Sequence, residues 1–127
     1  MATIDHQLIH LPTTGEFQKL RVIEWPNMVN GDKGQPISRA NFADRSVCGL
    51  GTFAGSTLTW KAFIGDPTNA AELADDANWL KLTDPSDNYL EMTEPKIEAI
   101  TQVAVLIRPE VSGGSTTGIT ARLAAKE

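Results

Sequence analysis

The feature that most limits the fold of this chain is a two-residue alternation of apolar and polar side chains, found over residues 56–62 and again over residues 117–123. The apolar positions are Leu58, Trp60 and Ala62 in the first segment and Ile119, Ala121 and Leu123 in the second. Successive side chains of a β-strand point to opposite faces, so each segment is predicted to be a strand with one face in the core.

Weaker signals predict further strands. Residues 20–25 have a strand-like composition and end at Pro26, and residues 45–53 contain glycines that indicate a bulge or a close backbone approach. Residues 103–108 are almost continuously apolar, which predicts a strand buried on both faces and ended by Pro109.

Residues 79–82 and 89–92 flank a stretch of turn-forming residues, 84–88, and are predicted to pair as a β-hairpin. Residues 94–101 have apolar residues at helical spacing, but their β-branched content favours a strand.

A single short helix is predicted, over residues 69–74 with Thr68 as its N-cap. Short strands, about seven or eight in number, without crossover helices predict an all-β fold, a jelly roll or a related β-sandwich. Residues 20–127 are expected to form this single domain. Residues 1–19 are expected to form an N-terminal arm or an edge strand.

Charge and composition exclude several classes of partner. The 127-residue chain has a formal net charge of −5 and its 11 basic residues are dispersed, so no nucleic acid is expected as a partner. No stretch approaches the length of about 18 apolar residues that would span a membrane, and residues 1–10 lack the features of a signal peptide. Cys48 is the single cysteine, so folding in a cytosol-like compartment without a disulfide is expected.

No group of residues predicts catalysis or a cofactor. His6 and His10 are four residues apart without a third metal ligand nearby, and residues 84–88 lack the frame of a calcium loop. The chain contains no nucleophile motif and no phosphate-binding glycine loop, and Cys48 is expected to be a small core residue. The protein is therefore expected not to be an enzyme and to act by binding another protein.

The tryptophans allow more than one interpretation. Trp60 lies in an alternating strand and is expected in the core. Trp25 and Trp79 lie at strand ends, where each could belong to the core or to an interface. An exposed cluster of Trp25, Trp79 and Tyr89 would indicate a carbohydrate- or receptor-binding module, which is the main alternative function. A pocket with two carboxylates, or with a histidine and a carboxylate, would indicate a small hydrolase.

A series of turn and strand segments resembles a known protein family. The segments are Trp25 and residues 30–36, 43–47, 51–57, 79–85, 97–98 and 107–114. In order and spacing they resemble the capsid decoration proteins, or cement proteins, of tailed bacteriophages. The chain departs from that family at residues 65–78, a segment longer than the short turn found there.

This resemblance implies a jelly roll or related sandwich that sits on the outer surface of the phage head and ties capsomers together, without catalysis or a cofactor. The implied partner is the major capsid protein, with self-association as a dimer or trimer on the capsid. The implied location is the virion, after synthesis in the cytoplasm of the bacterial host.

The N-terminal arm is expected to contribute to the capsid contact, because it contains apolar residues without an obvious place in the core. Edge strands and apolar arms offer unpaired backbone groups and anchors to a partner. The candidate contact residues are Leu8, Ile9, Leu11, Phe17 and Trp25.

Overall fold

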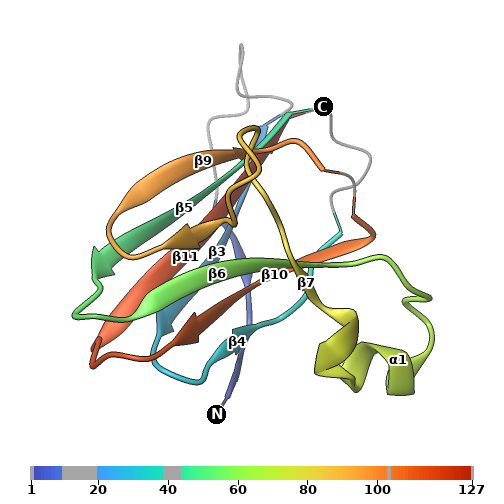
Figure 1. Ribbon diagram of the computed structural model, residues 1–127, viewed down its shortest axis with the longest axis horizontal. Coiled ribbons are helices and arrows are strands. Elements are labelled where there is room, and N and C mark those ends of the chain that lie inside the picture. The colour runs from blue at the N-terminus through green and yellow to red at the C-terminus, as the bar shows by residue number, and fades with distance from the viewer. Residues whose placement is uncertain (1, 10–19, 39–43, 103, 127) are drawn as a thin grey trace.

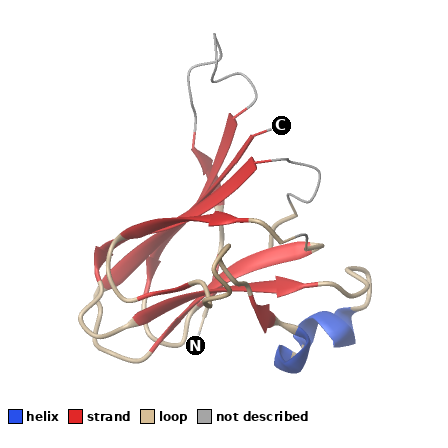
Figure 2. Ribbon diagram, turned by 45° about the horizontal axis from the view of Figure 1, so that its top comes forward, coloured by secondary structure: helices blue, strands red, loops and turns tan. Residues whose placement is uncertain are grey.

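The computed structural model describes residues 2–9, 20–38, 44–102 and 104–126, and it confirms the predicted all-β sandwich. Two sheets pack face to face, and the helical segment lies at one corner (Figures 1 and 2). In sheet A the order is β1 (Thr3–Ile4), β4 (Lys33–Gly34), β10 (Leu106–Ser112), β6 (Thr57–Phe63) and β7 (Leu80–Lys81), with β8 (Glu91–Met92) also beside β6. In sheet B the order is β2 (Gln7–Ile9), β3 (Leu20–Met28), β11 (Gly118–Lys126), β5 (Asp44–Thr52) and β9 (Lys96–Ile100).

The core between the sheets is built from the alternating residues that the sequence indicates. Leu58 and Trp60 of β6 and Ile119 and Leu123 of β11 have no exposed surface. The remaining predicted strands correspond to β3, β5, β7, β8, β9 and β10, and the structure adds β1, β2 and β4, each of two or three residues.

Two prolines that were predicted to end strands lie inside them. Pro26 is within β3, where the pairing with β11 shifts register between Ile119, opposite Met28, and Ala121, opposite Trp25. Pro26 and Asn27 lie in this β-bulge, where a residue without an N–H group does not interrupt the hydrogen bonds between the strands. Asn27 has a φ of 55°.

Pro109 is tolerated in the middle of β10 because the N–H groups of alternate residues in a strand point to opposite sides, and at position 109 the N–H group would not point towards β6. Two positions away on either side, Ile107 and Val111 point their N–H groups to the side of β4. They donate to Ile37 O and Asp32 O, at 2.9 and 3.0 Å. Opposite Pro109 on the other side is Trp60, whose N–H donates to Leu90 O, away from β10. A residue without an N–H group therefore costs the pairing of β6 and β10 nothing at this position.

The predicted hairpin is correct only at the base of its loop, where Leu90 N donates to Leu82 O. Beyond that point the two strands do not continue side by side: β7 pairs with residues 61–62 and β8 with residues 58–59 of β6. They follow one another along the same edge of sheet A, and residues 83–89 leave the sheet as a loop. Sequence signals for a hairpin and for an interrupted edge strand are the same.

The helical segment contains α1 (Ala70–Ala74) and a 3₁₀ turn, η2 (Asp76–Asn78). The N-cap of α1 is Asn69, whose side chain accepts a hydrogen bond from Glu72 N at 3.1 Å, so the prediction of Thr68 as the cap is wrong. Thr68 instead donates its hydroxyl to Asp66 at 2.6 Å, in the turn before the helix.

We expect Gly34→Ala to destabilise the fold by about 1–3 kcal/mol, because overpacking a core forces its neighbours to shift. A Cβ atom at Gly34 would lie 2.5 Å from Pro109 Cδ and 2.8 Å from Trp25 Cδ1. The matched control is Gly118→Ala in β11, where the nearest atom would be 3.4 Å away. Urea denaturation measures both free energies of unfolding, and equal values for the two variants would contradict this account of the core.

Candidate binding surfaces

The N-terminal residues are attached to both sheets along one edge of the sandwich. β1 runs parallel to β4, with hydrogen bonds from Lys33 N to Ala2 O and from Gln35 N to Ile4 O at 2.9 and 2.8 Å. β2 pairs antiparallel with β3. Residues 2–9 of the arm therefore occupy the edge-strand position of both sheets at once.

The predicted contact residues of the arm have different environments. Leu8 is 49 % exposed and Ile9 is half-buried, so both present apolar surface at the edge of sheet B. Leu11 and Phe17 lie outside the described residues. Trp25 is 0 % exposed, and its Nε1 donates to Gln35 O at 2.9 Å while the His6 ring packs edge-to-face against it at 6.0 Å. The structure places Trp25 in the core, where a partner could not reach it without opening the domain.

The aromatic cluster that would indicate a sugar site is not assembled at the surface. Trp25 and Trp79 are both buried. Tyr89 is 60 % exposed, and Lys81 Nζ lies 4.9 Å from the centre of its ring. A flat aromatic platform for a sugar ring needs an open ring face, and these three residues do not provide one together.

The segment of residues 65–78 covers part of the outer face of sheet A. Under it, Trp79 stacks on Phe63 with ring centres 5.3 Å apart, and the guanidinium of Arg108 lies 4.0 Å from the Trp79 ring. The indole Nε1 donates to Leu73 O at 2.9 Å. This small cluster is separate from the core between the sheets and anchors the helical segment.

Charged residues continue from this cluster across the outer face of sheet A. Arg108 pairs with Glu110 at 2.9 Å and with Asp76 at 3.3 Å, and Lys33 pairs with Asp76 at 2.6 Å. The hydrogen bond from Lys33 and the charge of Lys33, assisted by Arg108, hold the pKa of Asp76 below its usual range. The ion pairs connect η2 to β4 and β10, so they fix the helical segment on the sheet.

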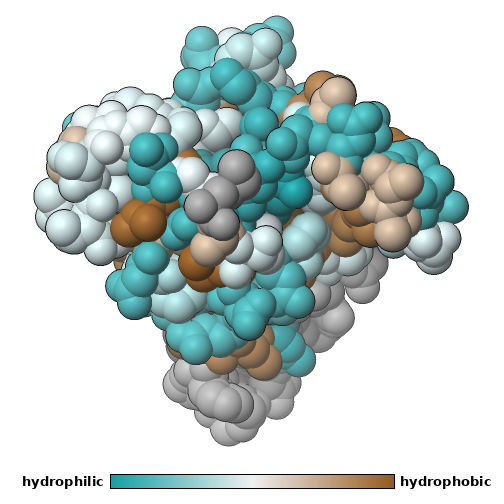
Figure 3. Space-filling model, turned by 90° about the horizontal axis from the view of Figure 1, so that it is seen from below, coloured by the Kyte–Doolittle hydropathy of each residue, from teal (hydrophilic) through white to brown (hydrophobic). Residues whose placement is uncertain are grey.

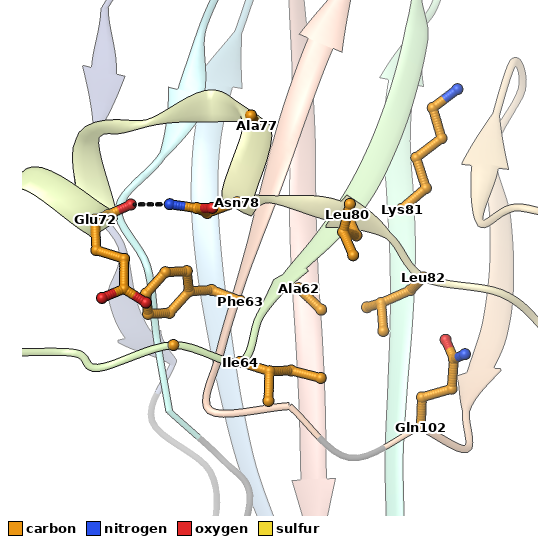
Figure 4. A pocket seen from close by; sticks show the side chains of 11 residues that line it. Ala62, Phe63, Ile64, Glu72, Ala77, Asn78, Leu80, Lys81, Leu82 and Gln102 are labelled. Atoms are coloured by element: carbon orange, nitrogen blue, oxygen red, sulfur yellow. Dashed lines mark hydrogen bonds between the residues drawn. The ribbon is translucent and has the colours of Figure 1, made fainter.

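A pocket of about 410 Å³ lies between the end of β6, the helical segment and β7 (Figure 4). Ala62, Ile64, Leu80 and Leu82 gather around its middle, with Glu72 towards one end and Gln102 towards the other. Ile64 and Leu80 are 74 % and 67 % exposed. Figure 3, a view from below, shows hydrophobic atoms at the right, in the region of the helical segment, among hydrophilic surface.

Ile64 and Leu80 are not among the contact residues predicted from the sequence, although the sequence contains a signal for Leu80. Trp79 and Leu80 are adjacent apolar residues in a predicted strand, and neighbours in a strand face opposite sides. Trp79 points to the outer face of sheet A and packs on Phe63 under the helical segment, so Leu80 points the other way and stays exposed at the edge of the sheet. Ile64 follows the end of β6, where no alternation continues.

The described residues contain no group of three or more His, Cys, Asp or Glu side chains that could hold a metal ion. No helix within the same part of the chain has the length and apolar character to cross a membrane. Cys48 is half-buried on β5, and burial raises the pKa of its thiol. Comparison of the sequence with protein-family models and with curated proteins finds no match.

We expect Arg108→Ala to destabilise the protein by about 2 kcal/mol, because it removes one partner of a largely buried ion pair. Arg108→Lys keeps the charge but not the planar stack on Trp79, so a loss of about 1 kcal/mol is expected. The control is Lys81→Ala, which breaks an exposed pair with Glu91 and is expected to cost at most about 0.5 kcal/mol. Denaturant titration checks the order of the three variants. A loss for Lys81→Ala as large as that for Arg108→Ala would contradict it.

The lowered pKa of Asp76 predicts a stability contribution that depends on pH. A carboxyl whose folded pKa is depressed stabilises the fold above its unfolded pKa, at about pH 4 and higher, and this contribution disappears as pH falls through the folded pKa. The difference in free energy of unfolding between the wild type and Asp76→Asn should therefore be present at pH 7 and vanish in acid. Added salt should reduce it, because Asp76 is exposed. A difference that grows in acid would refute the assignment.

Proposed function

We propose that the chain is a virion structural protein of a tailed bacteriophage, a decoration or cement protein that binds the outer surface of the major capsid protein lattice and stabilises the head. The resemblance noted in the sequence supports this role. A binding function also agrees with surfaces that offer exposed apolar residues and edge strands.

The observation that carries the proposal is that the segments responsible for the resemblance come together in space. Gly113 N donates to Asn30 Oδ1 at 2.8 Å, and Ser56 Oγ donates to Gly113 O at 2.8 Å. Three segments far apart in sequence, 30–36, 51–57 and 107–114, thus meet at one end of the sandwich. The turn at Gly113 thus holds the other two segments by side-chain hydrogen bonds, which is how residues distant in the sequence support one local structure.

The N-terminal edge is the proposed contact with the capsid. β2 is the terminal strand of sheet B, so within the described residues its outer side has no neighbouring strand. A capsid segment could add to this edge by main-chain hydrogen bonds, with Leu8 as an apolar anchor beside it. Many weak contacts of this kind on one lattice would add up through avidity.

The first experiment is co-sedimentation of the purified protein with undecorated heads of the parent phage. Saturable binding at a fixed number of copies per major capsid subunit is expected, and no binding would refute the proposal. Leu8→Asp should reduce occupancy by about tenfold or more, the effect of burying a charge in a contact of this kind.

Leu80→Asp provides the matched control, because Leu80 is an exposed leucine of the same kind at the other apolar site, the pocket. Substitution of Leu8 is preferable to removal of the whole arm, since residues 2–9 also pair with both sheets and their loss would affect folding. If Leu80→Asp abolishes binding and Leu8→Asp does not, the contact lies at the pocket and the assignment of the arm is wrong.

A further inference from the structure

The pocket beside the helical segment contains an uncovered part of the inner face of sheet A. Leu80 lies opposite Ala62 in the pairing of β7 with β6, so the two side chains are on the same face of the sheet. Ala62 belongs to the core between the sheets, whereas Leu80 is largely exposed. Ile64 is largely exposed as well and lies across the pocket from Leu80 (Figure 4). Apolar side chains gathered in an open pocket are typical of an interaction site.

Each end of this pocket has a polar group with hydrogen-bonding capacity to spare. At one end, Glu72 Oε1 accepts a hydrogen bond from Asp66 N at 3.4 Å, and Glu72 Oε2 has no hydrogen-bond partner among the described residues. Gly65 leaves room for this carboxylate, since a Cβ atom there would collide with Glu72 Oε1. At the other end, Gln102 Oε1 accepts from Thr83 N at 2.8 Å, which leaves the Gln102 Nε2 hydrogens as donors.

The charge around the pocket favours a positively charged ligand. Residues 65–78 contain four carboxylates and no lysine or arginine. Within the described part of the chain, Asp76 alone among these four has an ion pair, so the charge of Glu72 is not neutralised. Lys81 also lines the pocket, but its Nζ lies 2.6 Å from Glu91 and points away from Glu72 (Figure 4). A cation that enters beside Glu72 therefore meets a complementary charge.

The open shape of the pocket favours a segment of another protein over a small molecule. A small ligand usually has about 70–90 % of its surface buried in its site. Ile64 and Leu80 are 74 % and 67 % exposed, so walls of this kind leave much of a small ligand in water. A side chain presented by a second protein is covered on its outer side by that protein. The donors of Gln102 suit a main-chain carbonyl group of such a segment.

We infer that this pocket binds an extended segment of a partner protein that has an apolar residue and, two positions away, a lysine or arginine. The apolar side chain fills the middle of the pocket and the cation pairs with Glu72. The volume of about 410 Å³ corresponds to a width of about 7 Å, and side chains two residues apart in an extended chain are about 6.6 Å from one another. The inference does not depend on the proposed capsid contact, which lies at the N-terminal edge.

The test uses the intact protein and the peptide acetyl-Thr-Thr-Leu-Thr-Arg-Thr-Thr-amide, in which threonines favour an extended chain and the leucine and arginine share one side. Binding is followed by NMR on isotope-labelled protein. The amide signals of Ile64 and Leu80 are expected to shift and saturate with a Kd of about 1 mM or below. The same peptide with citrulline in place of arginine keeps the shape without the charge, and we expect it to bind about fivefold more weakly.

Variants of the protein separate the two parts of the contact. Ile64→Asp should weaken binding of the arginine peptide by about tenfold or more, because it places a charge in the apolar middle. Its matched control is Ile97→Asp in β9, since Ile97 is 75 % exposed and lies outside the pocket. Glu72→Gln should weaken binding about fivefold and remove the preference for arginine over citrulline. Its control is Glu94→Gln, which changes an exposed glutamate outside the pocket.

Three outcomes overturn the inference. The first is the absence of a saturable shift of the Ile64 and Leu80 signals at about 5 mM peptide, a concentration well above the expected Kd. The second is an equal effect of Ile64→Asp and Ile97→Asp, which would place the peptide elsewhere. The third is equal affinity for the arginine and citrulline peptides, which would show that Glu72 does not recognise the cation. Capsid binding, measured separately by co-sedimentation, is unaffected by each of these results.

Discussion

The contact between two buried indole rings, one from each sheet, is the interaction on which the rest of the structure depends. Trp25 of β3 and Trp60 of β6 pack edge-to-face with ring centres 5.7 Å apart, and neither has exposed surface. Aromatic side chains contribute the largest buried areas in a core, so this pair sets the spacing of the sheets where it lies. Position 34 must be a glycine, because a side chain there would collide with Pro109 and with the Trp25 ring. On another side of Trp25, the His6 ring of the arm packs edge-to-face against the indole.

The fold could be predicted where one strand alone contains the signal. β6 and β11 alternate so regularly that their inward residues were identified correctly. The prolines were misjudged for a physical reason: whether Pro26 and Pro109 interrupt a strand depends on which backbone groups face a partner, and only the register reveals this. The same holds for β7 and β8, whose relation to β6 is set by contacts distant in sequence.

Binding surfaces were harder to predict, because the exposure of a side chain depends on how all segments of the folded chain pack around it. Leu8 could be identified as an apolar residue outside the alternating strands, and it is indeed exposed. Trp25 has a similar position at a strand end, yet the arm and Gln35 enclose it.

The interrupted edge strand of sheet A has a consequence for engineering. The loop of residues 83–89 begins and ends at adjacent points, held by the bridge between Thr83 and Tyr89 and by Asp84 N donating to Asn88 O at 2.8 Å. Since β7 and β8 pair with β6 independently, the length of the loop between them is not fixed by the sheet. Lengthening a loop whose ends are already held together costs little conformational entropy. Residues 85–87 are therefore a natural insertion point at which a foreign peptide can be displayed while the sandwich beneath it stays unchanged.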